Sequence, residues 1–101
     1  MSLYYDKNGK PMDMPTWSGQ LGCERVIGRT TLPDGKWIST VWLGLNHRTG
    51  DGPPLIFESM VFPADGNMSE LECRRYSTYA DAKAGHDELI DKWMAKVDTE
   101  K

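Results

Sequence analysis

The sequence contains few cysteines, and the two present lie far apart. Cys23 and Cys73 are accompanied by no CxxC pair and no cluster of cysteine and histidine. A structural zinc site is therefore not expected, because such sites need several ligands at short spacings. A disulfide would require an oxidising compartment, so we expect both residues to be plain thiols. We expect no metal and no other cofactor.

The sequence also lacks a long hydrophobic run and an excess of positive charge. No stretch approaches the ~18–20 apolar residues of a membrane span, and the first residues lack the basic and then apolar pattern of a signal sequence. The chain has 12 basic and 15 acidic side chains and therefore a net charge of −3. A protein that binds a nucleic acid polymer needs a cationic surface instead. The predicted setting is a reducing cytosol, with neither a membrane nor a nucleic acid polymer as partner.

Strong catalytic signatures are missing as well. The sequence has no P-loop, GxSxG elbow, HExxH pair or EF-hand loop, so we expect no enzymatic activity. His47 and Glu58 are the one acid–base pair to weigh, but Glu58 lies among apolar residues of a predicted strand, where we expect it to pair with an arginine. His86 is expected to be a core histidine with one hydrogen-bond partner.

The 101 residues predict a single α+β domain with three parts. Residues 1–22 are expected to form a hairpin, with Asn8-Gly9 supplying the two positive-φ residues of its turn, followed by an irregular cover. Residues 23–76 carry four strand-like runs, at 24–32, 37–45, 55–62 and 71–76, whose short connections predict an antiparallel four-stranded meander sheet. Residues 77–98 predict one C-terminal amphipathic helix, capped by Ser77 or Thr78. Its apolar stripe has steps of three and four residues: Ala82, His86, Leu89, Trp93 and Val97.

The two middle strands are apolar on both faces. Within 37–45 and again within 55–62, large apolar side chains occupy both alternating sets of positions. One helix covers one face of a four-stranded sheet, so the other face needs a second cover. Either the N-terminal hairpin and Trp17 fold over it, or a second copy of the chain does. We favour the second copy, that is, a homodimer.

All five arginines fall in the predicted sheet and its first long loop, whereas the lysines mostly lie elsewhere: Arg25, Arg29, Arg48, Arg74 and Arg75. Arginine offers a planar fork to phosphate and stacks on an adenine ring, so with neighbouring aromatics these side chains suit a nucleotide pocket. Pairing with glutamates across the strands is the equally good alternative. Arg75, Ser77 and Thr78 run into a helix N-terminus, which can hold an anion, and His47 beside Arg48 sits where a strand ends.

Several strings resemble a family of small phage and prophage proteins. They are STVWLGLNH at 39–47, PPLIFESMVF at 53–62, RYST at 75–78 and AGH at 84–86. Together they span about residues 37–90 and resemble the type 1 Thoeris anti-defence proteins, phage-encoded sponges that bind immune signals without cleaving them. This chain is shorter than the family between Phe62 and Leu71.

The resemblance implies a non-enzymatic protein in the cytoplasm of an infected bacterium. It implies a homodimer, or a dimer-based oligomer, that holds glycocyclic ADP-ribose or a cyclic oligonucleotide at the protomer boundary. Arg75 and Ser77 or Thr78 would bind this small anionic ligand, and Phe57 or Phe62 would stack on its base. The full set of expected ligand-binding residues adds three more side chains: Arg29, His47 and Arg48.

Two other functions compete with this expectation. A small phage protein could inhibit a host protein through an exposed apolar sheet face. A small hydrolase or phosphodiesterase using His47 and Glu58 ranks last, because the sequence carries no motif that supports it.

Overall fold

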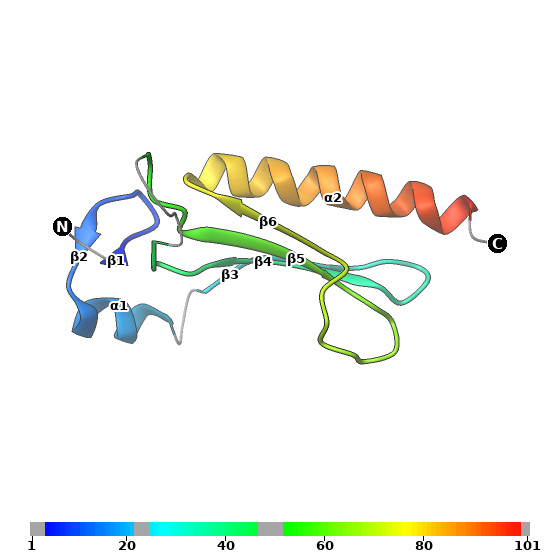
Figure 1. Cartoon of the computed structure of the whole chain (residues 1–101), viewed down its shortest axis with the longest axis horizontal. Helices are drawn as coiled ribbons and strands as arrows, with labels where there is room; N and C mark the ends of the chain where they lie inside the picture. Colours follow the sequence, from blue (N-terminus) through cyan, green and yellow to red (C-terminus); the bar gives the residue numbers. More distant parts are fainter. Residues whose placement is uncertain (1–3, 22–24, 47–51, 100–101) are drawn as a thin grey trace.

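A computed structural model describes residues 4–21, 25–46 and 52–99 of the chain (Figure 1). Its elements follow in the order β1 (Tyr4–Tyr5), β2 (Pro11–Met12), α1 (Met14–Leu21), β3 (Val26–Thr31), β4 (Trp37–Trp42), β5 (Phe57–Phe62), β6 (Glu72–Tyr76) and α2 (Tyr79–Thr99). The strands β3-β4-β5-β6 form one antiparallel sheet in sequence order, and β1-β2 form a separate hairpin. The predicted α+β fold, with its meander sheet, N-terminal hairpin and C-terminal helix, is confirmed.

Glycines make the tight turns between neighbouring strands. In the first hairpin the Asp6 carbonyl accepts the Gly9 N–H at 3.0 Å, and the Asp6 N–H is bonded to the Lys10 carbonyl. Gly9 has a φ of 83°, whereas no non-glycine residue has a positive φ among those described. The expectation that Asn8 also adopts positive φ is therefore wrong. The turn is a three-residue loop that ends in glycine. The one residue of this turn with a left-handed backbone is therefore Gly9, which has no Cβ and adopts positive φ without steric cost.

Helix α1 replaces the irregular segment that the sequence predicted before residue 22. Asp13 caps it, because its Oδ1 accepts the Thr16 N–H at 2.8 Å. Pro15 lies in the first turn, where the missing N–H costs no helical hydrogen bond. Trp17 then donates from Nε1 to the Leu43 carbonyl at 2.8 Å, which ties α1 to the chain beyond the end of β4.

The N-terminal segment packs at one end of the main sheet. Tyr5, Met12 and Trp17 contact a core cluster that includes Trp42 and Phe57, and Figure 1 shows β1, β2 and α1 beyond the sheet's end. They do not fold over the middle of the second face. Of the two covers considered for that face, the N-terminal one is thus not the arrangement found.

Helix α2 covers the other face of the sheet. Its apolar stripe buries Ala82 and Leu89 completely against strand residues such as Ile38 and Val61. Helix α2 begins at Tyr79, directly after Thr78. The Thr78 Oγ1 accepts the Asp81 N–H at 3.0 Å, so Thr78 is the N-cap of the helix. Within the described ranges, no helix combines the length and apolar character needed to cross a membrane.

A polar cluster lies within this interface. His86 is 8% exposed, with Nδ1 2.6 Å from Thr40 Oγ1 and Nε2 2.9 Å from Thr30 Oγ1. Thr40 Oγ1 in turn lies 2.5 Å from Ser59 Oγ. His86 is thus a core histidine, with two partners where one was expected. Burial lowers the pKa of His86, because a charged imidazolium is disfavoured in this setting.

Candidate functional site: the open face of the sheet

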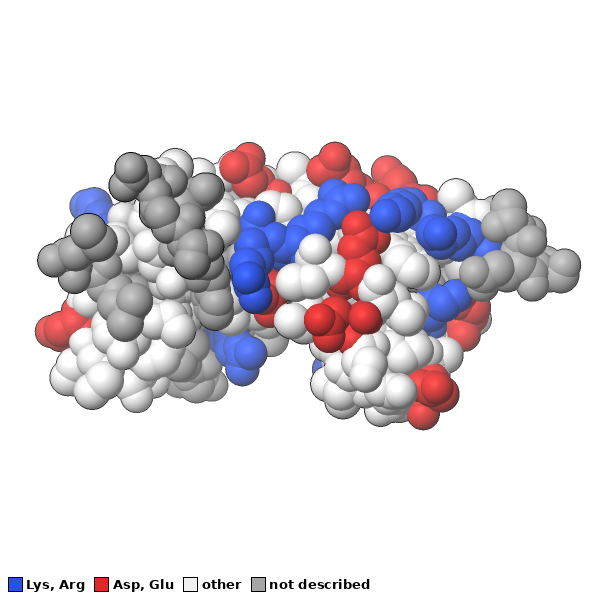
Figure 2. Space-filling view, viewed as in Figure 1, with Lys and Arg blue, Asp and Glu red and all other residues white. Residues whose placement is uncertain are grey.

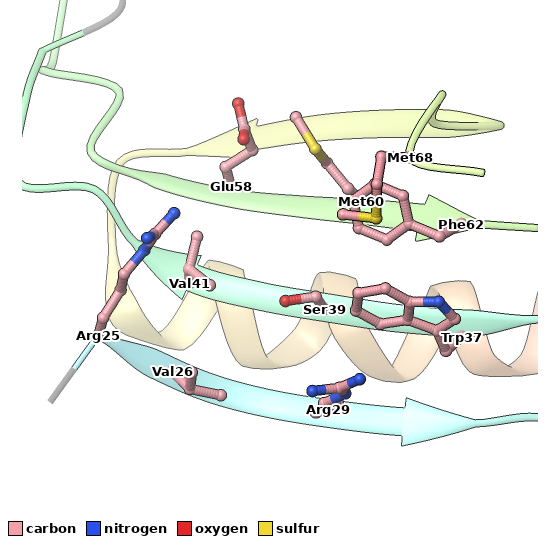
Figure 3. A pocket seen from close by; sticks show the side chains of 10 residues that line it. All are labelled: Arg25, Val26, Arg29, Trp37, Ser39, Val41, Glu58, Met60, Phe62 and Met68. Carbon is pink, nitrogen blue, oxygen red and sulfur yellow. The ribbon is translucent and has the colours of Figure 1, made fainter. Parts of the chain in front are cut away.

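A pocket of about 300 Å³ lies on the sheet face opposite α2. Figure 3 shows its side chains in front of the sheet with α2 behind, and Figure 2 shows a notch below the sheet between α1 and the loop that follows β5. Strands β3, β4 and β5, the residue just before β3 and that loop supply the lining residues: Arg25, Val26, Arg29, Trp37, Ser39, Val41, Glu58, Met60, Phe62 and Met68. We call this surface the open face.

Strand register arranges the open face in cross-strand rows. One row pairs Trp37 with Phe62, and the next aligns Arg29, Ser39 and Met60. A third row aligns Val41 with Glu58 and then with Arg75. Residues two apart on one strand share a face, so these three rows lie side by side in the pocket. The first row forms an aromatic end, Ser39 and Met60 form the middle, and the row with Glu58 forms a charged end.

The aromatic end holds a three-layer stack. The Trp37 and Phe62 rings are stacked with centroids 4.4 Å apart, and the Arg29 guanidinium carbon lies 4.4 Å from the Trp37 ring centroid. Stacking uses the flat face of a guanidinium and leaves the N–H groups at its edge available. Among the described residues no acidic side chain pairs with Arg29 or Arg25. The Arg29 guanidinium is therefore held against the Trp37 ring with no acidic partner among the described residues.

The charged end holds an ion pair. The Arg75 Nε lies 3.0 Å from Glu58 Oε2, so the expectation that Glu58 meets an arginine is confirmed. Glu58 is 8% exposed, and buried charged side chains are usually paired with a group of opposite charge, as Glu58 is here. Cys73, on the neighbouring strand, is a free thiol, and its pKa is raised first by burial and then by the negative charge of Glu58.

The structure brings only part of the predicted ligand set together. Arg29 and Phe62 line the pocket, and Arg75 pairs with the pocket residue Glu58. Phe57 lies on the opposite face and is 0% exposed, so it offers no ring surface to a ligand on the open face. Its side chain instead packs edge-on to Tyr79 at the start of α2.

The remaining predicted residues lie away from the pocket or beyond description. Ser77 and Thr78 join β6 to α2 and do not line it; the Thr78 hydroxyl is engaged in capping. Asp81 places an acidic side chain in the first turn of α2, which opposes an anion there. The proposed roles of His47 and Arg48 fall outside the described residues.

Several pocket residues were not predicted as ligand-binding ones: Arg25, Trp37, Ser39, Val41, Met60 and Met68. The sequence did contain a signal for some of them, because Trp37, Ser39 and Val41 alternate with residues that face α2. Nothing local in the sequence pointed to Met68, which reaches the pocket from the loop between β5 and β6. Among the described residues, no group of three histidine, cysteine or acidic side chains is placed to hold a metal ion.

No protein-family model matches the chain, and no curated protein or solved structure matches it significantly.

Proposed function

We propose that the protein is a non-enzymatic binding protein that holds a small, nucleotide-like anion on the open face. The observation that carries this proposal is the Arg29–Trp37–Phe62 stack, which fixes a guanidinium without an acidic partner among the described residues at the edge of a pocket. A guanidinium held in this way binds a phosphate through two parallel hydrogen bonds. Arg25, exposed at the same pocket, adds a second positive charge.

The rest of the pocket suits the planar part of such a ligand. Val41 and Met60 form a floor without charge, and Met68 approaches from the neighbouring loop. Methionine packs adaptably against flat rings. The pocket volume of about 300 Å³ is at the lower end of the range for small-molecule sites, roughly 300–1,000 Å³, so the open face of one chain would hold one nucleotide unit of a larger cyclic ligand.

The resemblance to the Thoeris anti-defence proteins supplies the biological setting of this proposal. The ligand would be a cyclic nucleotide-type immune signal, glycocyclic ADP-ribose or a cyclic oligonucleotide, which the phage protein sequesters intact. A second copy of the chain would complete the site as a homodimer. Two large apolar side chains at the pocket support this, because Val26 is 61% and Met68 is 65% exposed, and exposed apolar surface at a site favours a partner.

Ligand retention tests the proposal directly. Protein incubated with glycocyclic ADP-ribose or a cyclic trinucleotide is desalted and heated, and the released small molecules are identified by mass spectrometry. A sponge returns the ligand intact. An enzyme returns products. An inhibitor of host proteins returns nothing; the exposed side chains of Val26 and Met68 are also compatible with this alternative.

Two arginine variants locate the site. Arg29→Ala should lose retention, because it removes the fork that meets the phosphate. Arg74→Ala changes the charge equally but lies on the helix-facing side, where Arg74 meets Glu72 and Glu88, so it should retain the ligand. Analytical ultracentrifugation tests the dimer, since a mass that stays at 11.4 kDa at every concentration excludes it. Retention by Arg29→Ala equal to that of Arg74→Ala would exclude the proposed site.

A further inference from the structure

Strand β3 is one edge of the main sheet, and some of its backbone groups point away from the sheet. At the turn between β3 and β4, the Leu32 N–H donates to the Lys36 carbonyl at 2.7 Å, so these two residues are a hydrogen-bonded pair. Such pairs alternate along an antiparallel ladder. The register of β3 with β4 therefore turns the N–H and C=O of Thr31 and Arg29 outward. No described residue is bonded to these groups.

The side chains of β3 suit pairing with another strand better than those of β6, the opposite edge. Four of the six residues of β3 are β-branched, and Arg29 is its one charged side chain. Natural sheets often block an edge by placing charged side chains on it. β6 is such an edge, because it carries Glu72, Arg74 and Arg75, which all take part in ion pairs. The edge that remains open to another strand is therefore β3.

A second copy of β3 has one favourable antiparallel register with the first. Placing Arg29 opposite its own copy sets like charges directly against each other, which is destabilising. Placing Thr31 opposite its own copy sets Arg29 against Pro33, which has no N–H to donate. A register centred before Arg29 runs through the irregularity that follows Val26. Pairing Thr31 with the partner's Arg29 avoids all three problems, and it sets Thr30 opposite its own copy.

We infer that a second copy of the chain pairs with β3 in this register, so that the two main sheets become one continuous antiparallel sheet. The twofold axis runs perpendicular to the sheet at Thr30, which leaves both open faces on the same side and uncovered. Residues directly opposite each other in an antiparallel pair share a face. Since Arg29 lines the open face, the partner's Arg29 joins that face beside Thr31, in the cross-strand row of Trp37.

The second arginine gives the dimer a shared binding surface. Each open face then carries the Arg29 of its own chain and, across the twofold axis, the partner's Arg29. Two guanidinium groups suit a ligand with more than one negative charge. This shared site rests on the proposed function, because it assumes an anionic ligand on the open face. The pairing of β3 with its copy does not depend on that assumption.

Sedimentation equilibrium of the ligand-free protein tests the pairing. The mass of the natural chain should rise with concentration from 11.4 kDa towards twice that value. Thr31→Pro removes an outward N–H, a change that an edge strand tolerates. It should raise the Kd of the dimer roughly tenfold or more, because two hydrogen bonds per dimer are lost. Thr31→Ala keeps the N–H and should dimerise like the natural chain. A natural chain that stays monomeric, or equal association of the two variants, would overturn the inference.

Cysteine cross-linking tests the register and does not require that Thr31→Pro folds. In a Cys23→Ser, Cys73→Ser background, Thr30→Cys places two thiols opposite each other with Cα atoms ~4.5 Å apart, within the range of roughly 4.4–6.8 Å for a disulfide. Thr31→Cys lies diagonal to its own copy, with Cα atoms ~7–8 Å apart, which is too far. Thr30→Cys should therefore form the covalent dimer much faster. Faster cross-linking of Thr31→Cys, or none by either variant, would overturn the register.

Ligand retention in the desalting assay tests the shared site. Thr31→Pro should retain less cyclic ligand than Thr31→Ala, because the monomer lacks the partner's Arg29. Equal retention by a monomeric Thr31→Pro protein would exclude that arginine from the site and leave the β3 pairing standing. Failure of the proposed function gives a different result: the natural chain dimerises through β3 but retains no ligand.

Discussion

Substituting Gly85 by alanine should destabilise the protein, although alanine is the better helix former. Gly85 lies on the buried side of α2, and a Cβ at this position would collide with the ring and hydroxyl of Tyr76. An alanine in a helix interior gains about 1 kcal/mol over glycine. Overpacking a close contact costs up to about 3 kcal/mol, and three Tyr76 atoms are involved here. The net loss should therefore be about 2 kcal/mol.

Thermal denaturation followed by circular dichroism measures this loss. A net 2 kcal/mol lowers the Tm of a domain of this size by roughly 10 °C. Ala84→Gly is the matched control, since Ala84 is exposed on the same helix and should cost only about 1 kcal/mol through helix propensity. Tyr76→Phe removes one of the three colliding atoms and should recover part of the loss in the Gly85→Ala background. A Gly85→Ala protein with a higher Tm would refute the packing argument.

Three further predictions concern pH, capping and the stack. Because the pKa of folded His86 lies below its ordinary value, the unfolded chain takes up the proton first as the pH falls. The contribution of His86 to the free energy of unfolding should therefore be complete above about pH 6.5 and should decline below it, by at most about 1.4 kcal/mol per pH unit, until the pKa of the folded state is reached. Urea denaturation at pH 7.5 and 5.5 measures this decline. The His86→Gln variant should show a smaller difference between the two pH values. Thr78→Ala should cost about 1 kcal/mol, because it removes the cap of α2, whereas Thr78→Ser should cost little; equal losses in the two variants would contradict the capping role. Trp37→Ala should weaken ligand retention, because it releases the Arg29 guanidinium, and Trp37→Phe should preserve most of it in the same desalting assay; full retention by the alanine variant would contradict the role of the stack.

The elements of the main sheet and α2 were predictable because their sequence patterns are local. Alternation in 37–42 and spacing by three and four in 79–97 each follow from the backbone geometry of one element. Helix α1 was not predicted, because Pro15 suggests an interruption and the helix has only eight residues. The Asp13 cap was the local evidence for it.

The candidate site was predictable only in part, because it depends on register between strands. Arg29, Phe62 and Arg75 were expected to bind a ligand from their residue type and position. Whether a strand residue faces α2 or solvent depends on which set of alternating positions the helix covers, and both sets are apolar in the middle strands. Phe57 illustrates this, since its residue type suits stacking and its strand parity places it in the core.

The stack beneath Arg29 also bears on how much entropy is lost when a ligand binds. A free arginine side chain carries about 2 kcal/mol of rotamer entropy, most of which a ligand must remove on binding. Contact with Trp37, itself held by Phe62, restricts the guanidinium before any ligand arrives. An Arg29→Lys protein would keep the charge and lose the planar contact. Its binding should therefore weaken mainly through a less favourable entropy, with a smaller change in enthalpy.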